Sequence, residues 1–280
     1  MSAAPAPEEL SALIRLLDDE TPVVRSRVSE RIACFGGDIS EWLASLPHEL
    51  SSKEKKILAE MLSTPRREAL AREWVVPTGG SSALEEDWES FESLLQTLSD
   101  FLHDGITLRQ PLSDALDLLA EEASEDGVLD ENDLRSFLFE GDRLKGNQKD
   151  YYDPRNSDLA WAISEGRSNP LGLCLIYMLI ARRLDLEVEG INFPGHFLCR
   201  IHQDGYPLVI DCFDGGRLHL QSTLLENAEQ LSKQQKIQLK QTAGPGIIIM
   251  RLLNNLSQSL KQADRQEDAL LIQELRKTLG

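Results

Sequence analysis

Residues 168–213 read SNPLGLCLIYMLIARRLDLEVEGINFPGHFLCRIHQDGYPLVIDCF, and this stretch decides the fold. Asn169 followed by Pro170 predicts a helix start, because asparagine caps free backbone N–H groups and proline suits the first helical position. Apolar residues then surround the helix almost completely until about Asp185. An all-round apolar surface indicates a helix buried in the core.

Antiparallel strands are expected after this helix. Residues 188–191 and 196–202 have the composition of strands, and a further strand is predicted at 208–213. Asp204–Gly205 separates the last two and is typical of a two-residue hairpin turn. A buried helix packed on an antiparallel sheet makes the predicted fold class α+β.

The expected hairpin register brings two titratable side chains together. His196 and Asp211 become diagonal neighbours on one face, with Cβ atoms roughly 6–8 Å apart. A carboxylate at this range can orient an imidazole as a catalytic base. The same register sends Cys199 and Cys212 to the opposite face, away from His196, which leaves Cys174 as the candidate nucleophile.

Helical patterns flank this core on both sides. Residues 13–37 look like one HEAT-type helical pair, and residues 77–82 have the composition of a linker. The segments 251–260 and 267–279 form a helical pair that looks like a TPR unit. We therefore expect four segments, namely a HEAT-like region at 1–75, further helices at 84–145, the helix–sheet core at 146–222 and C-terminal helices at 223–280.

Composition restricts the expected cellular location of the protein and the expected classes of partner. The 280 residues include 47 acidic and 29 basic ones, a net charge of −18, which disfavours a nucleic-acid partner. Residues 1–10 lack the basic and apolar regions of a secretory signal, and no apolar run reaches the length of a membrane span. The four cysteines show no CxxC pair and no zinc-ligand spacing. We expect a cytoplasmic protein with reduced thiols and without a metal, a cofactor or a membrane contact.

Three ordered motifs carry a family resemblance. They are DYYDPRNS at 150–157, PGHF at 194–197 and DCFDGG at 211–216. With Asn147, the helices from about residue 84 and the run PGIIIMRLLNNLSQSL at 245–260, they closely resemble the SirB-type branch of the transglutaminase-like superfamily. The resemblance covers about residues 84–260. It implies a papain-like core, in which a helix with cysteine at its N-terminus packs on an antiparallel sheet with histidine and aspartate.

The resemblance also implies a chemistry. In active members cysteine attacks a glutamine amide or a peptide bond, histidine is the base and aspartate orients it. His196 and Asp211 fall on the matching positions, but Asn169–Pro170 stands where the superfamily places its cysteine. Cys174 is the fifth residue of the helix, beyond the first turn in which the helix dipole lowers a thiol pKa.

Three functions follow from these observations. The favoured one is a binding or regulatory module for a protein or peptide partner. The rival is a cysteine acyl-transfer enzyme, such as a protease, amidase or transglutaminase, that uses Cys174, His196 and Asp211. A helical interaction scaffold is the third. Candidate cleft residues are Asn156, Arg155 and Asn169, although a turn held by side-chain hydrogen bonds explains the first two equally well.

Overall fold

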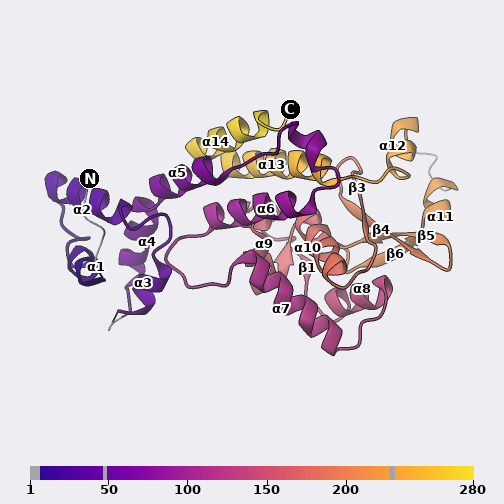
Figure 1. The fold of residues 1–280 in the computed structure, drawn as a ribbon, viewed down its shortest axis with the longest axis horizontal. Coiled ribbons are helices and arrows are strands. Elements are labelled where there is room, and N and C mark those ends of the chain that lie inside the picture. Colours follow the sequence, from indigo (N-terminus) through magenta and orange to yellow (C-terminus); the bar gives the residue numbers. More distant parts are fainter. Residues whose placement is uncertain (1–6, 47–48, 227–230) are drawn as a thin grey trace. The chain divides into compact units, whose positions relative to one another are not determined.

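A computed structural model describes residues 7–46, 49–226 and 231–280 (Figure 1). Residues 1–6, 47–48 and 227–230 lie outside the described residues. The first range belongs to the segment without an expected export signal, the second to the expected HEAT-like region and the third to the expected C-terminal helices. The chain forms two compact units, one made of residues 1–75 and 100–110 and one of residues 76–99 and 111–280. The motif-bearing segment 146–216 lies in the second unit.

The first unit is built from helices. Their bounds are α1 (Pro7–Ile14), α2 (Pro22–Ala33), α3 (Ser40–Ala44), α4 (Ser52–Met61) and α5 (Ser63–Glu73). Leucine and isoleucine side chains at helical spacing form its core, with Ile14 of α1, Ile32 of α2 and Leu58 of α4 all buried. A capping box between Ser51 and Glu54 fixes the start of α4.

The second unit carries the remaining helices, except that the end of α6, from residue 100 on, is counted with the first unit. Before the sheet come the 3-10 helix η1 (Gly80–Leu84), α6 (Trp88–Leu102), α7 (Leu112–Glu125), α8 (Glu131–Phe139), the 3-10 helix η2 (Pro154–Ser157), α9 (Leu159–Glu165) and α10 (Pro170–Arg183). After the sheet come α11 (Gln221–Glu226), α12 (Lys233–Gln238), α13 (Pro245–Gln262) and α14 (Gln266–Lys277). Helices α13 and α14 lie side by side, at the yellow end of the chain in Figure 1.

Helix α10 is the core helix of the second unit. All residues from 170 to 181 are buried, as the apolar pattern predicts. The Asn169 side chain accepts the backbone N–H of Gly172 at 2.9 Å, and Pro170 takes the first helical position. The predicted helix start is therefore confirmed.

A four-stranded antiparallel sheet packs against this helix. Its order is β3 (Glu189–Ile191), β4 (Leu198–Gln203), β5 (Tyr206–Asp211) and β6 (Arg217–Leu220). Gln203 pairs with Tyr206, and Asp204 and Gly205 both have positive φ, so the predicted two-residue turn and register are confirmed. Strand β6 was not predicted; it is mostly exposed and only four residues long.

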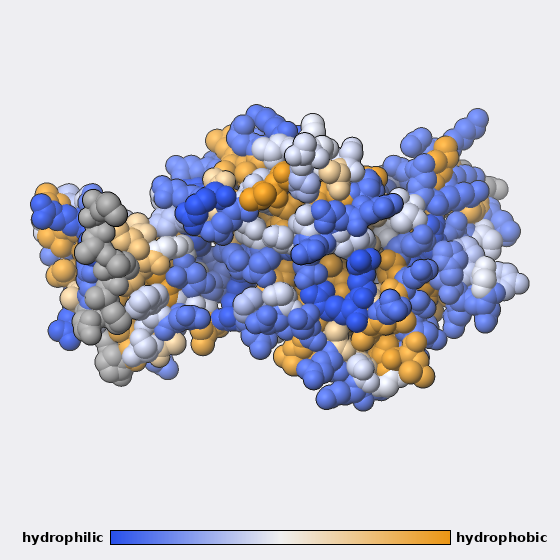
Figure 2. Space-filling model, in the orientation of Figure 1, coloured by the Kyte–Doolittle hydropathy of each residue, from blue (hydrophilic) through white to orange (hydrophobic). Residues whose placement is uncertain are grey.

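A short parallel ladder joins the helical part of this unit to α10. Strand β1 (Lys145–Gly146) pairs with β2 (Arg167–Ser168), which directly precedes the start of α10. The helices and the antiparallel sheet together give the predicted α+β class. Among the described helices, none is both long and apolar enough to cross a bilayer. Figure 2 shows hydrophilic residues over much of the face drawn there.

Candidate functional site

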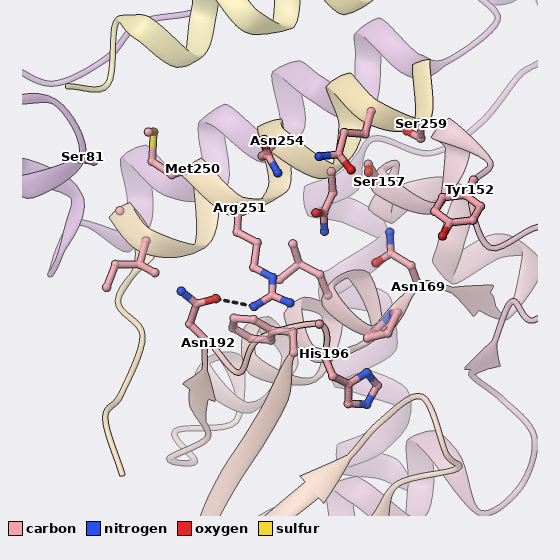
Figure 3. A pocket seen from close by; sticks show the side chains of 18 of the residues that line it. Ser81, Tyr152, Ser157, Asn169, Asn192, His196, Met250, Arg251, Asn254 and Ser259 are labelled. Atoms are coloured by element: carbon pink, nitrogen blue, oxygen red, sulfur yellow. Dashed lines mark hydrogen bonds between the residues drawn. The ribbon is translucent and has the colours of Figure 1, made fainter. Parts of the chain in front are cut away.

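A polar cleft of about 910 Å³ opens beside the N-terminal end of α10. Its walls come from η1, the segment 151–157, the first residues of α10, the loop 192–197 and the exposed side of α13. Figure 3 shows His196 and Asn169 in this cleft, with Arg251 reaching into it from α13. All the lining residues belong to the second unit.

His196 and Asp211 form a hydrogen-bonded pair at the edge of the cleft. His196 Nε2 lies 2.8 Å from Asp211 Oδ1, and the same oxygen accepts the backbone N–H groups of Phe213 at 3.0 Å and Asp214 at 3.1 Å. His196 stands before the first residue of β4, after a turn that Gly195 makes with φ of 78°. The structure thus brings together the two residues that the register predicts to be neighbours.

This contact shifts the pKa of both partners. The hydrogen bond to Asp211 raises the pKa of His196 above its ordinary value, although burial opposes it. Burial raises the pKa of Asp211, but the hydrogen bond and charge of His196 and the two backbone N–H groups outweigh it, so that pKa is lowered. The pair therefore favours imidazolium facing carboxylate.

Cys174 lies beneath the cleft and does not line it. Its side chain is fully buried, and Sγ lies 3.5 Å from the carbonyl oxygen of Phe197. The sulfur atoms of Cys174, Cys199 and Cys212 all lie within 4.8 Å of one another. Cys199 and Cys212 do occupy the sheet face opposite Val209, as the register predicts, but that face is the one that packs on α10.

The prediction that His196 and Asp211 face the helix along a regular strand therefore needs correction. Leu198 and Val209, which share their strand face, pack on the other side of the sheet against Leu239. His196 reaches the N-terminal end of α10 only because it precedes β4 and follows the turn at Gly195. Strand alternation does not govern such a residue.

The three thiols differ in acidity. Burial raises the pKa of Cys199 and Cys212 well above the ordinary thiol value. At Cys174 burial also raises the pKa, but hydrogen bonds from the other two thiols and the charge of His196 lower it further than burial raises it. Cys174 is therefore the thiol of this group that ionises first.

The other predicted cleft residues occupy different positions. Asn169 lines the cleft while it caps α10. Asn156 is buried below it, where its Nδ2 donates to the carbonyl oxygens of Asp150 and Tyr151 and its Oδ1 accepts from Asn147 at 2.9 Å. Arg155 is exposed, pairs with Asp153 at 2.7 Å and lies outside the lining.

Arg251 is a cleft residue that the sequence did not reveal. Its Nη1 donates to Asn192 Oδ1 and to the carbonyl oxygen of Phe193 at 2.8 Å, and the guanidinium lies 5.5 Å from the Phe197 ring centroid. Burial lowers its pKa. Within the described part of the chain, it makes no ion pair with a carboxylate. The only feature of the sequence that could have indicated Arg251 as a cleft residue was its position as a single basic residue after the apolar run at 245–250.

Comparison with known proteins identifies the family. A family model described as the transglutaminase-like superfamily matches residues 107–254, just over half of the chain. The chain belongs to the transglutaminase-like superfamily. At the level of the superfamily this confirms the resemblance carried by the motifs at 150–157, 194–197 and 211–216.

Curated relatives match over parts of their length. A UPF0162 protein of Xylella fastidiosa is 36% identical over 142 residues, which cover 49% of this chain and 50% of that protein. A UPF0162 protein of Pseudomonas aeruginosa is 39% identical over 108 residues, 38% of this chain and 39% of its own. Human F-box only protein 21 is 29% identical over 140 residues, 47% of this chain and 21% of that protein. The chain thus spans half or less of these relatives. No solved structure gives a significant match.

The His196–Asp211 pair and Cys174 differ in their access to the cleft. His196 and Asp211 have the geometry of a base and its orienting carboxylate. A nucleophile must also reach the substrate, and the Cys174 sulfur is fully buried. Among the described residues that line the cleft, none carries a thiol.

Proposed function

We propose that this transglutaminase-like core is a binding or regulatory module whose cleft holds a segment of a protein or peptide partner without covalent chemistry. The observation that carries the proposal is the burial of Cys174 beside an intact His196–Asp211 pair. A peptide segment is the ligand class that the superfamily's cleft accommodates. The amide side chains of Asn169, Asn192 and Asn254 in this cleft suit its backbone.

The charges of the cleft favour a carboxylate on the ligand. Nη1 of Arg251 donates to the neutral oxygens of Asn192 and Phe193. Among the described residues Nε and Nη2 have no acceptor, so both can donate to an anion. Two carboxylates also line the cleft, but Asp153 is paired with Arg155 and Glu85 lies beside Gly244 at the start of α13. We therefore propose Arg251 as the anchor for an acidic side chain or a chain terminus of the partner.

One observation supports the acyl-transfer enzyme as a second candidate. Cys174 ionises before its neighbours, and the charge of His196 contributes to that. For this function the Phe197 segment, whose carbonyl oxygen contacts Sγ, would have to move and expose the thiol. The enzyme therefore requires a second conformation, whereas the binding module does not.

The finer family and domain assignments are part of the same proposal. We propose a SirB-type protein whose first unit is HEAT-like and whose α13–α14 pair is TPR-like; the helical first unit and the antiparallel packing of that pair support this. The third candidate, an interaction scaffold, would use these helices instead of the cleft. Four unpaired cysteines support a cytoplasmic location.

A peptide selection tests the binding module. A random peptide library displayed on phage is selected against the full chain, and recovered peptides are measured by fluorescence anisotropy. We expect acidic peptides whose affinity falls more than about tenfold in Arg251→Gln and in His196→Ala, because each change removes a charged hydrogen-bond partner. Arg217→Gln is the matched control, since Arg217 is exposed, pairs with Asp214 and lies outside the cleft.

The same peptides separate the three candidates. Equal binding by wild type and both cleft variants would refute the module, and loss only on deletion of residues 1–75 would favour the scaffold. Cleavage of a peptide, or a covalent adduct detected by mass spectrometry with wild type and absent with Cys174→Ser, would establish the enzyme instead.

A further inference from the structure

Three of the four cysteines meet in the core of the second unit. Cys174 comes from α10, Cys199 from β4, and Cys212 follows the last residue of β5. All three side chains are fully buried, and their sulfur atoms lie within 4.8 Å of one another. Sequence spacing does not reveal this group, because its members are 25 and 13 residues apart and meet only through the helix–sheet packing.

The spacing of the sulfurs fits a metal–thiolate centre. Metal–sulfur bonds are about 2.3 Å long, so a metal bound equally to three sulfurs needs sulfur–sulfur distances of about 3.8 to 4.0 Å. Such a triangle fits within the 4.8 Å limit of this group without a change of fold. Cys174 lies within α10, Cys199 lies within β4 and Cys212 directly follows β5, so helix and sheet hold the positions of the three ligands.

We propose that Cys174, Cys199 and Cys212 form a three-coordinate binding site for one Cu(I) ion. Thiolates are soft ligands and select Cu(I) and Zn(II) among the common metals. Zn(II) takes four ligands in closed structural sites, and in the described part of the chain no histidine or carboxylate joins this group. Three sulfurs alone therefore fit Cu(I), which accepts trigonal coordination.

The cations near the three cysteines can compensate for the negative charge that the thiols acquire when they bind Cu(I). Each thiol that coordinates releases its proton to solvent, and the copper keeps its oxidation state, so no electron donor or acceptor is needed. The bound centre is anionic, and the two cations of the cleft, His196 and Arg251, both interact electrostatically with Cys174. They offset part of the negative charge that burial would otherwise disfavour.

The cleft provides a route to this centre. Pro170 and Leu171 line the cleft and precede Cys174 by one helical turn, which places all three on one side of α10. Phe197 also lines the cleft, and its carbonyl oxygen contacts the Cys174 sulfur. One layer of residues thus separates the cleft from the thiols. This proposal concerns the core beneath the cleft and does not depend on what the cleft itself binds.

A copper titration tests the site. Reduced, metal-free full-length protein is titrated anaerobically with Cu(I) in competition with bathocuproine disulfonate, and thiolate-to-copper absorption is followed in the ultraviolet. We expect one equivalent per chain in wild type. Cys199→Ser and Cys212→Ser should each weaken Cu(I) binding by more than about tenfold. Loss of a residue that only hydrogen-bonds a metal ligand already lowers metal affinity by about tenfold or more, and loss of the ligand itself should lower it at least as much. Cys34→Ser, which removes the exposed cysteine, is the control and should bind like wild type.

Two measurements keep the test decisive if a serine variant unfolds. X-ray absorption of the wild-type copper complex should give three sulfur neighbours at about 2.3 Å, and bound Cu(I) should leave only Cys34 open to alkylation in denaturant. Binding that disappears in Cys34→Ser, sulfur coordination by fewer than three atoms, or Zn(II) that displaces Cu(I) at equal concentration would each overturn the proposal.

Discussion

His196 Nε2 contacts Asp211 Oδ1 at 2.8 Å, and the two backbone N–H groups that follow β5 hold the same carboxylate oxygen in place. In the neutral imidazole, Nε2 therefore carries the proton that Asp211 accepts, and Nδ1 is the acceptor nitrogen. The carboxylate is itself fixed by backbone, so the orientation of the ring depends little on long flexible side chains. The effect of Asp211 on the pKa of His196 can therefore be examined by titration.

Replacement of Asp211 by asparagine should lower the pKa of His196. In wild type the hydrogen bond to the carboxylate raises that pKa against the opposing effect of burial. Without the carboxylate charge burial remains, so the histidine should titrate below its ordinary value of about 6.5. NMR titration of the His196 imidazole Cε1 signal in wild type and in the variant measures this. An unchanged His196 titration in the variant would contradict the assigned role of Asp211.

The stability difference between wild type and Asp211→Asn should depend on pH. The raised His196 pKa contributes stability below about pH 6.5, and this is lost as pH rises through the folded-state pKa. The lowered Asp211 pKa contributes stability above about pH 4, and this is lost as pH falls through the folded-state pKa. The difference in unfolding free energy should therefore be largest near pH 5 and smaller at pH 9. Urea unfolding of both proteins at several pH values checks this; a difference that does not change with pH would argue against the ion pair.

Iodoacetamide should label one cysteine in the native protein. Cys34 is exposed, whereas Cys174, Cys199 and Cys212 are fully buried. A buried sulfur reacts only when the structure opens, so the other three should react at rates set by unfolding. Mass spectrometry of tryptic peptides after native and denatured labelling distinguishes the four sites. Fast native labelling of Cys174 would instead support an exposed thiol and the acyl-transfer enzyme.

Gly172→Ala should destabilise the second unit. A Cβ at this position would lie 2.1 Å from Ser168 Oγ and 2.8 Å from the carbonyl oxygen of Asn156. Overpacking of this kind costs about 1–3 kcal/mol, which exceeds the helix propensity that alanine adds. Gly141→Ala is the control, because a Cβ there meets nothing within 4 Å. Thermal unfolding should show a lower midpoint for the first variant and little change for the second.

Arg200→Lys should also destabilise this unit. Arg200 is buried and its guanidinium bonds Glu189, Thr242 and the carbonyl oxygens of Leu239 and Lys240. Lysine cannot reproduce this planar set of donors, so at least one buried acceptor loses its partner at a cost of about 1–3 kcal/mol.

The control for Arg200→Lys is the same change at an exposed ion pair. Arg217→Lys keeps a charge near Asp214 at the surface and should change the unfolding free energy by less than about 0.5 kcal/mol. Equal effects of the two substitutions, measured by urea unfolding, would show that the network around Arg200 contributes nothing specific.

Local signals in the sequence predicted the parts of the fold that local chemistry determines. The cap at Asn169, the proline at 170 and the Asp204–Gly205 turn each specify a backbone geometry, so the core helix and the hairpin register were correct. The same register placed His196 near Asp211, but the direction in which His196 points depends on the turn at Gly195, which strand alternation does not describe. Strand β6 was missed because it has only four residues, and the alternation of Leu218 and Leu220 with Arg217 and His219 is too short to distinguish a strand from a loop.

Features that depend on packing between distant segments could not be predicted in this way. The grouping of the three cysteines requires knowing which face of the sheet meets α10, and strand alternation alone leaves that choice open. Arg251 enters the cleft because α13 lies along it, although Arg251 is 55 residues from His196 in the chain. The four-segment division of the chain stays a prediction.

The buried contacts around Gly172 have a consequence for how related chains can diverge. Ser168 Oγ donates to the carbonyl oxygen of Asn156 at 2.7 Å, and Gly172 fits against both, so the α10 side of the cleft tolerates little substitution. On the opposite wall, Asn254 and Gln258 are exposed on α13 and are not part of the buried core. Mutations there can change what is recognised at almost no cost in folding free energy. Homologues can therefore share one scaffold and one histidine–aspartate pair and still acquire different specificities.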